Sequence, residues 1–427
     1  MLFRSACATL ALAVTGLPVS IQPAWAQPSV ETAGDARALG FDPATFETLD
    51  ARLEALAADG ARPGYAAIIA RGTEIAHVSE AGVIDVETGA PFTVDSPVRI
   101  ASMTKPVTAV ATMMLVEDGR ISLDDPVSDY IPEFADVRVA VSPMANEAGE
   151  IETRAPETVM TIHHLLTHTA GLGYVFDGET DLGRLYAENS LYSGEGNLEA
   201  RMQQLAALPL YTDPGERWFY SYANDVLGRV VEVASGMPFE DFMETEIFEP
   251  LGMTSTGFFF EDVDFPEAEM SPLYIHTEDG SLAEYEESFM PDWASGGAGL
   301  VSTANDYLRF AMMLANDGAL GDVRILEPET VELMMQPHVT GERLGDWGAR
   351  AFAYSGYVEL QPEEGQDTDG VPGDYGWGGY FDTVFFVSPA THVSAVALTQ
   401  IQPGPHKPAP DTGDVFRPLV YSSFAFD

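Results

Sequence analysis

The chain has 427 residues, of which 46% are hydrophobic, enough material for a large buried core in one domain or two. It carries 20 basic and 67 acidic residues, a formal net charge of −47 at pH 7, and a field of this sign repels polyanions, which excludes nucleic acid and anionic membrane surfaces as partners. The single cysteine, Cys7, falls in the N-terminal leader, so disulfides, thiol catalysis and cysteine metal sites are excluded from the rest of the chain.

The first 26 residues have the layout of a cleaved secretory signal, with a basic start, an apolar run from Ala6 to Val19 and the small-residue sequence Ala24-Trp25-Ala26. Gly16 and Pro18 interrupt the apolar run, which is too short to span a bilayer. We therefore predict a signal peptide over residues 1–26, cleavage near Ala26, no membrane span, and a periplasmic or secreted protein.

The stretch from Tyr65 to Ile100 predicts short strands of an antiparallel sheet, and the first two, Ala66–Ala70 and Ile75–Val78, are joined through Arg71-Gly72. A helix is expected from Ser102 to Asp118, because apolar residues recur there at helical spacing. Pro106 fits this helix only if it begins just before the proline, so Ser102 and Lys105 are expected in its first turn.

The rest of the chain divides into a helical stretch and a return to strands. Helical patterns occur at Ile162–Leu166, Leu198–Leu208 and Asp225–Val233. Strand patterns follow at Leu300–Ser302 and in a hairpin of Thr383–Val387 with Val393–Thr399, and Val415–Phe424 predicts a closing helix. We expect residues 27–119 and 291–427 to form an α/β domain of the α+β type, an antiparallel sheet flanked by helices, and residues 120–290 to form a mostly helical domain.

Lysine is rare in this sequence. Only Lys105 and Lys407 are present, and arginine supplies the other basic residues. A specific role would explain Lys105, whereas Lys407, in a proline-rich stretch, is interpreted as a residual surface lysine. The excess of acidic residues also predicts self-repulsion that salt would screen, and we hypothesise a marine or halophilic source.

Ser102 and Lys105 stand three residues apart, so on a helix their side chains can touch. A serine hydroxyl becomes a strong nucleophile when a neighbouring base takes its proton, and a desolvated lysine can be that base. Tyr220, just before the helix expected near Asn224, is either an aromatic packed at a loop-to-helix junction or a phenol that shuttles a proton beside the ammonium.

The sequence Gly376-Trp377-Gly378-Gly379-Tyr380 comes directly before the predicted hairpin. Paired glycines on a strand mark a bulge, or they let a ligand or another backbone approach closely. A strand edge here would also be able to aim a backbone N–H at an oxyanion.

The order Ser-x-x-Lys, Tyr-Ser and Trp-Gly-Gly resembles the family VIII carboxylesterases, relatives of class C β-lactamases and D-alanyl-D-alanine carboxypeptidases. The resemblance covers nearly all of the chain after the signal. Flanking blocks in the same order strengthen it: residues 161–172 (TIHHLLTHTAGL), 225–230 (DVLGRV), 250–253 (PLGM) and 297–303 (GAGLVST).

This resemblance implies a β-lactamase/transpeptidase-like fold and hydrolysis of short-acyl esters through an acyl-enzyme, without cofactor or metal. Ser102 would be the nucleophile, and Lys105 with Tyr220 would take and return the proton. The backbone N–H groups of Ser102 and Tyr380 would form the oxyanion hole. The substrate-binding residues would be Trp377, Gly378, Gly379, Tyr174, Tyr222 and Asp225.

Two departures from the family pattern bear on the substrate. Trp377-Gly378-Gly379 stands where β-lactamases and carboxypeptidases have Lys-Thr-Gly, and Tyr222 replaces an amide that would contact a β-lactam side chain. A neutral small-molecule ester therefore suits the site. Cephalosporin hydrolysis, with Arg350 in place of the missing charge, and D-alanyl-D-alanine carboxypeptidase activity are the alternatives.

Other classes lack their signatures. No serine sits in Gly-x-Ser-x-Gly, so an α/β-hydrolase is disfavoured. His164 and His168 stand four residues apart, but no glutamate or third ligand completes a zinc pattern, and we interpret both as structural. A binding module without catalysis would usually have lost Ser102, Lys105 or Tyr220.

Overall fold

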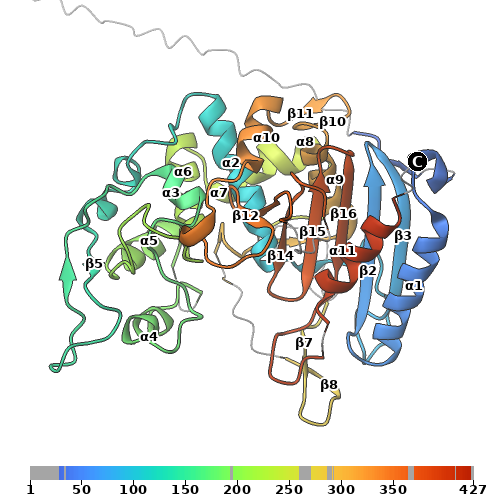
Figure 1. The fold of residues 1–427 in the computed structure, drawn as a ribbon, viewed down its shortest axis with the longest axis horizontal. Helices are drawn as coiled ribbons and strands as arrows, with labels where there is room; N and C mark the ends of the chain where they lie inside the picture. The colour runs from blue at the N-terminus through green and yellow to red at the C-terminus, as the bar shows by residue number, and fades with distance from the viewer. Residues whose placement is uncertain are drawn as a thin grey trace, which may run out of the picture.

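The computed structural model describes residues 28–32, 35–192, 196–258, 271–285, 291, 293–363, 370–408 and 410–424. The predicted signal peptide lies outside these residues. Within them the main sheet has eight strands in the order β1-β3-β2-β16-β15-β14-β13-β12 (Figure 1). Their bounds are Glu31–Thr32 (β1), Gly64–Arg71 (β2), Glu74–Gly82 (β3), Arg350–Phe352 (β12), Tyr357–Glu359 (β13), Tyr375–Gly379 (β14), Thr383–Ser388 (β15) and Val393–Leu398 (β16).

The sheet is antiparallel at every pairing except one. β1 runs parallel to β3, with Glu31 opposite Glu74, so the sheet is mixed and the expectation of a purely antiparallel sheet is wrong at this edge. Two residues are too few to leave a pattern in the sequence. The predicted hairpin is confirmed, because Val384 pairs with Ala397 and Ser388 with Val393 across β15 and β16.

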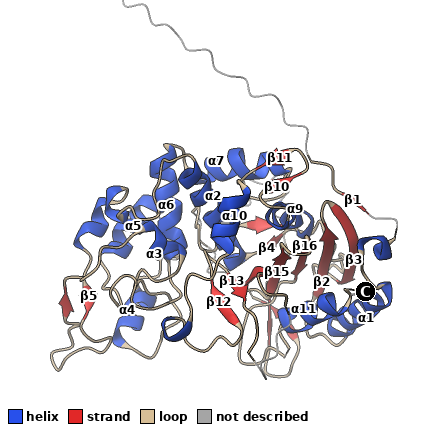
Figure 2. Cartoon of the chain, turned by 45° about the horizontal axis from the view of Figure 1, so that its top comes forward, coloured by secondary structure: helices blue, strands red, loops and turns tan. Residues whose placement is uncertain are grey.

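Helices cover both faces of the sheet, and β2 shows how one strand serves two cores. Ala66, Ile68 and Ala70 point into the core shared with α2 (Thr104–Glu117) and α9 (Ala304–Ala315). The alternate residues Tyr65, Ala67 and Ile69 pack with α1 (Pro43–Ala58) and α11 (Thr412–Ser422). Figure 2 shows the strands between these two layers. Burial on both faces explains the unbroken apolar run of β2.

A second, mostly helical part lies beside the sheet, and its helix α6 packs on α2. The helices predicted at 162–166, 198–208 and 225–233 are confirmed within a few residues. The helices of this part are α3 (Ile162–Leu166), α4 (Asp181–Glu188), α5 (Leu198–Ala206), α6 (Ala223–Ser235), α7 (Phe239–Met243) and α8 (Glu249–Leu251).

The small hairpin of β7 (Tyr274–His276) and β8 (Leu282–Glu284) belongs by its contacts to the sheet part. Tyr274 bridges to Ile401, and the His276 ring lies 3.0 Å from the Ala61 carbonyl. The remaining elements are β4 (Val98–Arg99), β5 (Val139–Ala140), β6 (Thr153–Arg154), β9 (Val301–Ser302), β10 (Ala319–Leu320), β11 (Val323–Arg324) and α10 (Pro328–Met335). Among the described residues no helix is long and apolar enough to cross a bilayer.

Lys407 is not the residual surface lysine that its surroundings in the sequence indicate. Its side chain is 13% exposed, and Nζ lies 3.1 Å from Asp382 and 2.8 Å from Asp411. Asp382 also binds buried Arg62, with Nε to Oδ2 at 2.6 Å, and accepts the backbone N–H of Thr412 at 3.0 Å. This ion network ties the turn after β14 to the start of α11, an arrangement that only the folded chain brings together.

Candidate active site

Ser102 lies in a 3-10 turn, Ala101–Met103, directly before α2. The spacing predicted Ser102 inside the first turn of the α-helix. In the structure Ser102 instead precedes this helix. Buried Ala101 has φ of 43°, a left-handed conformation that costs a non-glycine residue about 1–3 kcal/mol. Strain of this kind persists where the surroundings fix the chain, and here it presents the Ser102 hydroxyl to the cavity.

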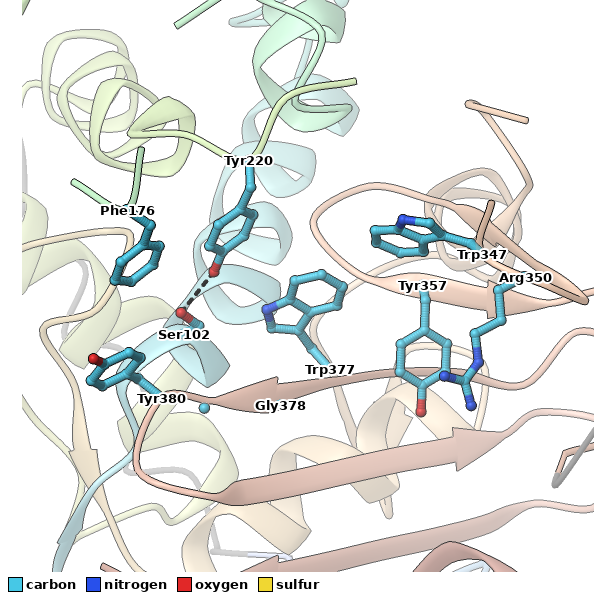
Figure 3. A pocket seen from close by; sticks show the side chains of 10 residues that line it. Ser102, Phe176, Tyr220, Trp347, Arg350, Tyr357, Trp377, Gly378 and Tyr380 are labelled. Carbon is cyan, nitrogen blue, oxygen red and sulfur yellow. Dashed lines mark hydrogen bonds between the residues drawn. The ribbon is translucent and has the colours of Figure 1, made fainter. Parts of the chain in front are cut away.

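The structure brings Ser102, Lys105 and Tyr220 together. The Lys105 ammonium donates to Ser102 Oγ at 3.2 Å. The Tyr220 hydroxyl donates to the same oxygen at 2.7 Å (Figure 3). One donor comes from the start of α2, and the other from the loop before α6, 118 residues from Ser102. Two groups that can carry a proton thus converge on one hydroxyl, the arrangement that activates a nucleophile.

Lys105 is held by a main-chain acceptor and by aromatic faces. Its side chain is fully buried, and Nζ donates to the Gly297 carbonyl at 2.7 Å. The Tyr220 and Tyr174 ring centroids lie 4.6 and 5.5 Å from Nζ. No ion pair to Lys105 occurs among the described residues. The Gly297 carbonyl and the two rings thus hold the Lys105 ammonium beside Ser102 Oγ.

Asp225 stands behind Lys105 rather than in the cavity. Its carboxylate accepts from Ser295 Oγ at 2.5 Å and from the Gly297 N–H at 3.1 Å. It is fully buried, and burial raises its pKa above the usual value, while the Ser295 hydrogen bond and the Lys105 charge act in the opposite direction. Asp225 thus fixes the turn whose carbonyl receives Lys105.

His168 packs against Tyr220: the two rings stack with their centroids 5.1 Å apart. His168 Nδ1 accepts the Ser221 N–H at 3.2 Å. Complete burial, and then the nearby Lys105 charge, hold the pKa of His168 well below its usual value, so the imidazole is neutral. Within the described part of the chain, no group of three His, Cys, Asp or Glu side chains is arranged to hold a metal ion.

The glycines of β14 let the strand approach the nucleophile turn. A Cβ on Gly379 would lie 2.1 Å from Thr383 Oγ1 and 2.4 Å from the Ile100 carbonyl oxygen, so only glycine fits there. A Cβ on Gly378 would meet Thr383 O at 3.3 Å only. The close approach predicted from the paired glycines is therefore confirmed at Gly379. It brings Tyr380, the next residue, to the cavity beside Ser102.

The cavity above Ser102 has a volume of about 500 Å³ and a largely aromatic lining. In Figure 3, Phe176 and Tyr380 lie on one side of Ser102, and Trp377, Trp347 and Tyr357 extend away on the other. Arg350, Tyr220, Gly378 and Gly379 complete the lining.

Of the residues predicted to bind substrate, Trp377, Gly378 and Gly379 line the cavity. Tyr174 is 5% exposed, bonds through its hydroxyl to Tyr192 at 2.7 Å and does not line the cavity. Tyr222 is fully buried and accepts the Leu191 N–H at 3.3 Å, so it packs behind the site. Four further groups of the site were not predicted from the sequence: Phe176, Trp347, Tyr357 and the Gly297 carbonyl.

The chain belongs to the Beta-lactamase family, whose profile it matches over residues 49–416. Esterase EstB of Burkholderia gladioli is 33% identical over 393 residues, which are 85% of this chain and 94% of EstB. An uncharacterised protein of Mycobacterium tuberculosis (strain CDC 1551 / Oshkosh) is 33% identical over 354 residues, 80% of this chain and 86% of its own.

Among solved structures, EstCE1, described as a hydrolase with promiscuous acyltransferase activity, has a TM-score of 0.71 at 26% identity and covers 92% of this chain and 99% of its own. The resemblance to family VIII esterases is thus confirmed, and so is the β-lactamase/transpeptidase-like fold. The protein is a serine hydrolase of the Beta-lactamase family, with esterases and acyltransferases among its relatives.

Proposed function

We propose that the protein is a carboxylesterase that hydrolyses short-acyl esters through an acyl-enzyme on Ser102. The observation that carries the proposal is the convergence of Lys105 Nζ and the Tyr220 hydroxyl on Ser102 Oγ, at 3.2 and 2.7 Å, at the base of an aromatic cavity. The esterase among its relatives supports the same reaction class.

In the proposed acylation step the Lys105–Tyr220 pair enters with one proton fewer than ammonium plus phenol. It takes the Ser102 proton as Oγ attacks the ester carbonyl. The C–O bond to the alcohol then breaks, and the pair returns the proton to the departing alkoxide. Deacylation repeats the sequence with water in place of Ser102. The backbone N–H groups of Ser102 and Tyr380 would stabilise the oxyanion in both steps, and each such donor is typically worth about 10²- to 10³-fold in rate.

Charge in the cavity favours a neutral ester over a β-lactam. Where β-lactamases carry a lysine, this chain presents Trp377, which is apolar. Arg350 does line the cavity, but its Nε is bonded to Glu359 at 2.9 Å, and its guanidinium lies 4.7 Å over the Tyr357 ring. The Arg350 charge is therefore already partly compensated within the protein, which weakens it as a receptor for a substrate carboxylate.

The proposal is tested by incubating the protein with p-nitrophenyl butyrate, p-nitrophenyl laurate, nitrocefin and a D-alanyl-D-alanine peptide in parallel. We expect turnover of the butyrate ester that is lost in Ser102→Ala. Dominant nitrocefin turnover would indicate a β-lactamase, and release of D-alanine a carboxypeptidase. Ester hydrolysis that survives Ser102→Ala would remove the nucleophile from the proposal.

A further inference from the structure

Phe176 is the only aromatic side chain among the large hydrophobic residues that stand well exposed in the described part of the chain, at 53%. It lies at the cavity, where its ring stacks on Tyr380 with centroids 5.5 Å apart and planes 10° from parallel. Its edge contacts Tyr174 at 4.9 Å. An apolar ring left partly in water at a ligand site, with its other face already packed, is a surface available for substrate contact.

The Phe176–Tyr380 stack makes the cavity asymmetric about Ser102. Phe176 belongs to the loop before α4, and Tyr380 follows β14, so the stack joins the helical part to the sheet part beside the nucleophile (Figure 3). On the other side of Ser102 the cavity continues past Trp377 toward Trp347 and Tyr357. Of the acyl and alcohol groups of a bound ester, one therefore meets the wall formed by Phe176 and Tyr380. The other extends into the open side of the cavity.

The position of Tyr220 indicates which side of the cavity takes the alcohol and which takes the acyl chain. The alcohol must leave within reach of the Tyr220 hydroxyl, because that group shares in returning its proton. The Tyr220 ring lies 5.8 Å from Trp377, which lines the open side of the cavity, and 5.3 Å from the buried Tyr174. Among the described rings, Phe176 contacts Tyr174 and Tyr380 but not Tyr220. The alcohol is thus directed toward Trp377 and Trp347 and the acyl chain toward Phe176.

We propose that Phe176, closed against Tyr380, is the residue that limits the acyl-chain length that Ser102 accepts, while the aromatic side of the cavity admits large alcohols. This inference rests on the proposed esterase function and adds its substrate class: esters of a short acid with a bulky, apolar alcohol. Removing the Phe176 ring opens the wall without disturbing a buried core, because the ring is half in water.

The test compares Phe176→Ala with the wild type on p-nitrophenyl esters of acetate, butyrate, octanoate and laurate. Each additional buried methylene is worth about fourfold in affinity. We therefore expect kcat/KM for octanoate relative to butyrate to rise roughly tenfold or more in Phe176→Ala. Phe176→Tyr, which keeps the ring, should retain the wild-type profile. Val233→Ala, at an exposed apolar residue on α6, serves as the control remote from the cavity.

A second series fixes the acyl group as butyrate and varies the alcohol from methyl to phenyl to naphthyl. The relative rates in this series should not change in Phe176→Ala. An unchanged acyl-length profile in that variant, or a change confined to the alcohol series, would overturn the assignment.

Covalent labelling keeps this inference separable from the proposed function. p-Nitrophenyl butyl- and dodecylphosphonate place an alkyl chain in the acyl position and react once with a nucleophilic serine, so labelling of Ser102 can be followed by mass spectrometry without ester turnover. We expect Phe176→Ala to raise the dodecyl to butyl labelling ratio roughly tenfold or more. Equal ratios in variant and wild type would refute the role of Phe176, whereas absent ester turnover with normal labelling would refute only the esterase.

Discussion

The Tyr220 hydroxyl is the atom on which the chemistry of this site is most easily separated from its packing. Tyr220→Phe keeps the ring against His168 and Trp377 and removes only the donor 2.7 Å from Ser102 Oγ. We predict a loss of about 10²- to 10⁴-fold in kcat, the usual worth of a proton-transfer group. The change in unfolding free energy should be about 1 kcal/mol, that of one hydrogen bond.

The matched control is Tyr174→Phe, because Tyr174 also stands beside Lys105 but gives its hydroxyl to Tyr192. Its kcat should stay near the wild-type value while its melting temperature falls. Equal losses of kcat in the two variants would show that any missing phenol near Lys105 disturbs the site, and would count against a specific relay through Tyr220.

Gly378 and Gly379, at the end of β14, should respond differently to substitution by alanine. In Gly379→Ala the new methyl would lie 2.4 Å from the Ile100 carbonyl oxygen, and either β14 or the nucleophile turn must shift. We expect destabilisation by about 1–3 kcal/mol and loss of most activity. Gly378→Ala, whose methyl meets one atom at 3.3 Å, should unfold like the wild type and alter KM more than kcat. Thermal melts and esterase kinetics on both variants check this.

At the scale of single residues, the chain pattern predicted the centre of the site well and its surroundings poorly. Ser102 and Lys105 are local neighbours, so helical spacing alone brings them together, and Tyr220 followed from the order of the motifs. The Gly297 acceptor is a main-chain carbonyl and has no side-chain signature. Phe176 sits in a loop without periodicity, and nothing in its neighbours indicates a stack with a residue 204 positions further on.

The contact between α3 and the segment after α10 contains a pair of histidines that predicts a pH dependence. His163 Nδ1 lies 3.0 Å from the Tyr354 hydroxyl, and His338 stacks on the same ring at 4.0 Å. The two imidazoles meet at 5.6 Å. Burial lowers the pKa of both histidines below 6.5. The charges of His164 and Arg343 lower the pKa of His163 further, and Asp124 raises it. The charge of His163 lowers the pKa of His338 further, and the hydrogen bond to the Leu333 carbonyl raises it.

A lowered pKa in the folded state means that the unfolded chain binds more protons below pH 6.5, so the folded state loses stability as the pH falls through that value. His338→Phe keeps the stack on Tyr354 and cannot be protonated. Relative to the wild type, its melting temperature should therefore improve between about pH 8 and pH 5.5, measured by differential scanning fluorimetry. Parallel curves for the two proteins over this range would remove the titration of His338 as the cause.

Prediction of elements succeeded where one periodicity persisted over a full element. The β15–β16 hairpin was expected from two short apolar runs around a turn, and the helices α3, α5 and α6 from helical spacing, each within a few residues. The helices α1, α9 and α10 were not predicted. In α9 every residue but two is buried, because it lies between the sheet and other helices, so an amphipathic stripe is largely absent from its sequence.

Across the whole molecule, sequence separation hides the contacts that hold the site together. The turn that carries Ser102 is near residue 100, and Tyr220, which donates to Ser102, is near 220. The acceptor of Lys105 is near 297, and the strand that approaches the Ser102 turn is near 379. The ion network of Arg62, Asp382 and Lys407 likewise joins residues that are far apart in the sequence, close after Tyr380 in the chain. Residue spacing predicts contacts only within one or two helical turns. Contacts between distant segments are therefore predicted from the order of motifs in a known family, or are seen only in the folded structure.

The net charge of −47 gives the prediction that belongs to the molecule as a whole, and it carries our proposal of a marine or halophilic source. The folded state concentrates the excess carboxylates that the unfolded chain spreads apart, and salt weakens their repulsion by shortening the Debye length from about 30 Å at 0.01 M to about 8 Å at 0.15 M. We therefore expect the melting temperature to rise by several degrees over this range, and then more slowly up to 1 M NaCl. Sucrose at matched osmolality stabilises by exclusion from the protein surface, and should give a gradual rise without the steep initial part. A melting temperature that stays flat or falls between 0.01 and 0.15 M NaCl would mean that the carboxylates do not repel one another appreciably more in the folded state. That result would overturn the proposal of a saline habitat.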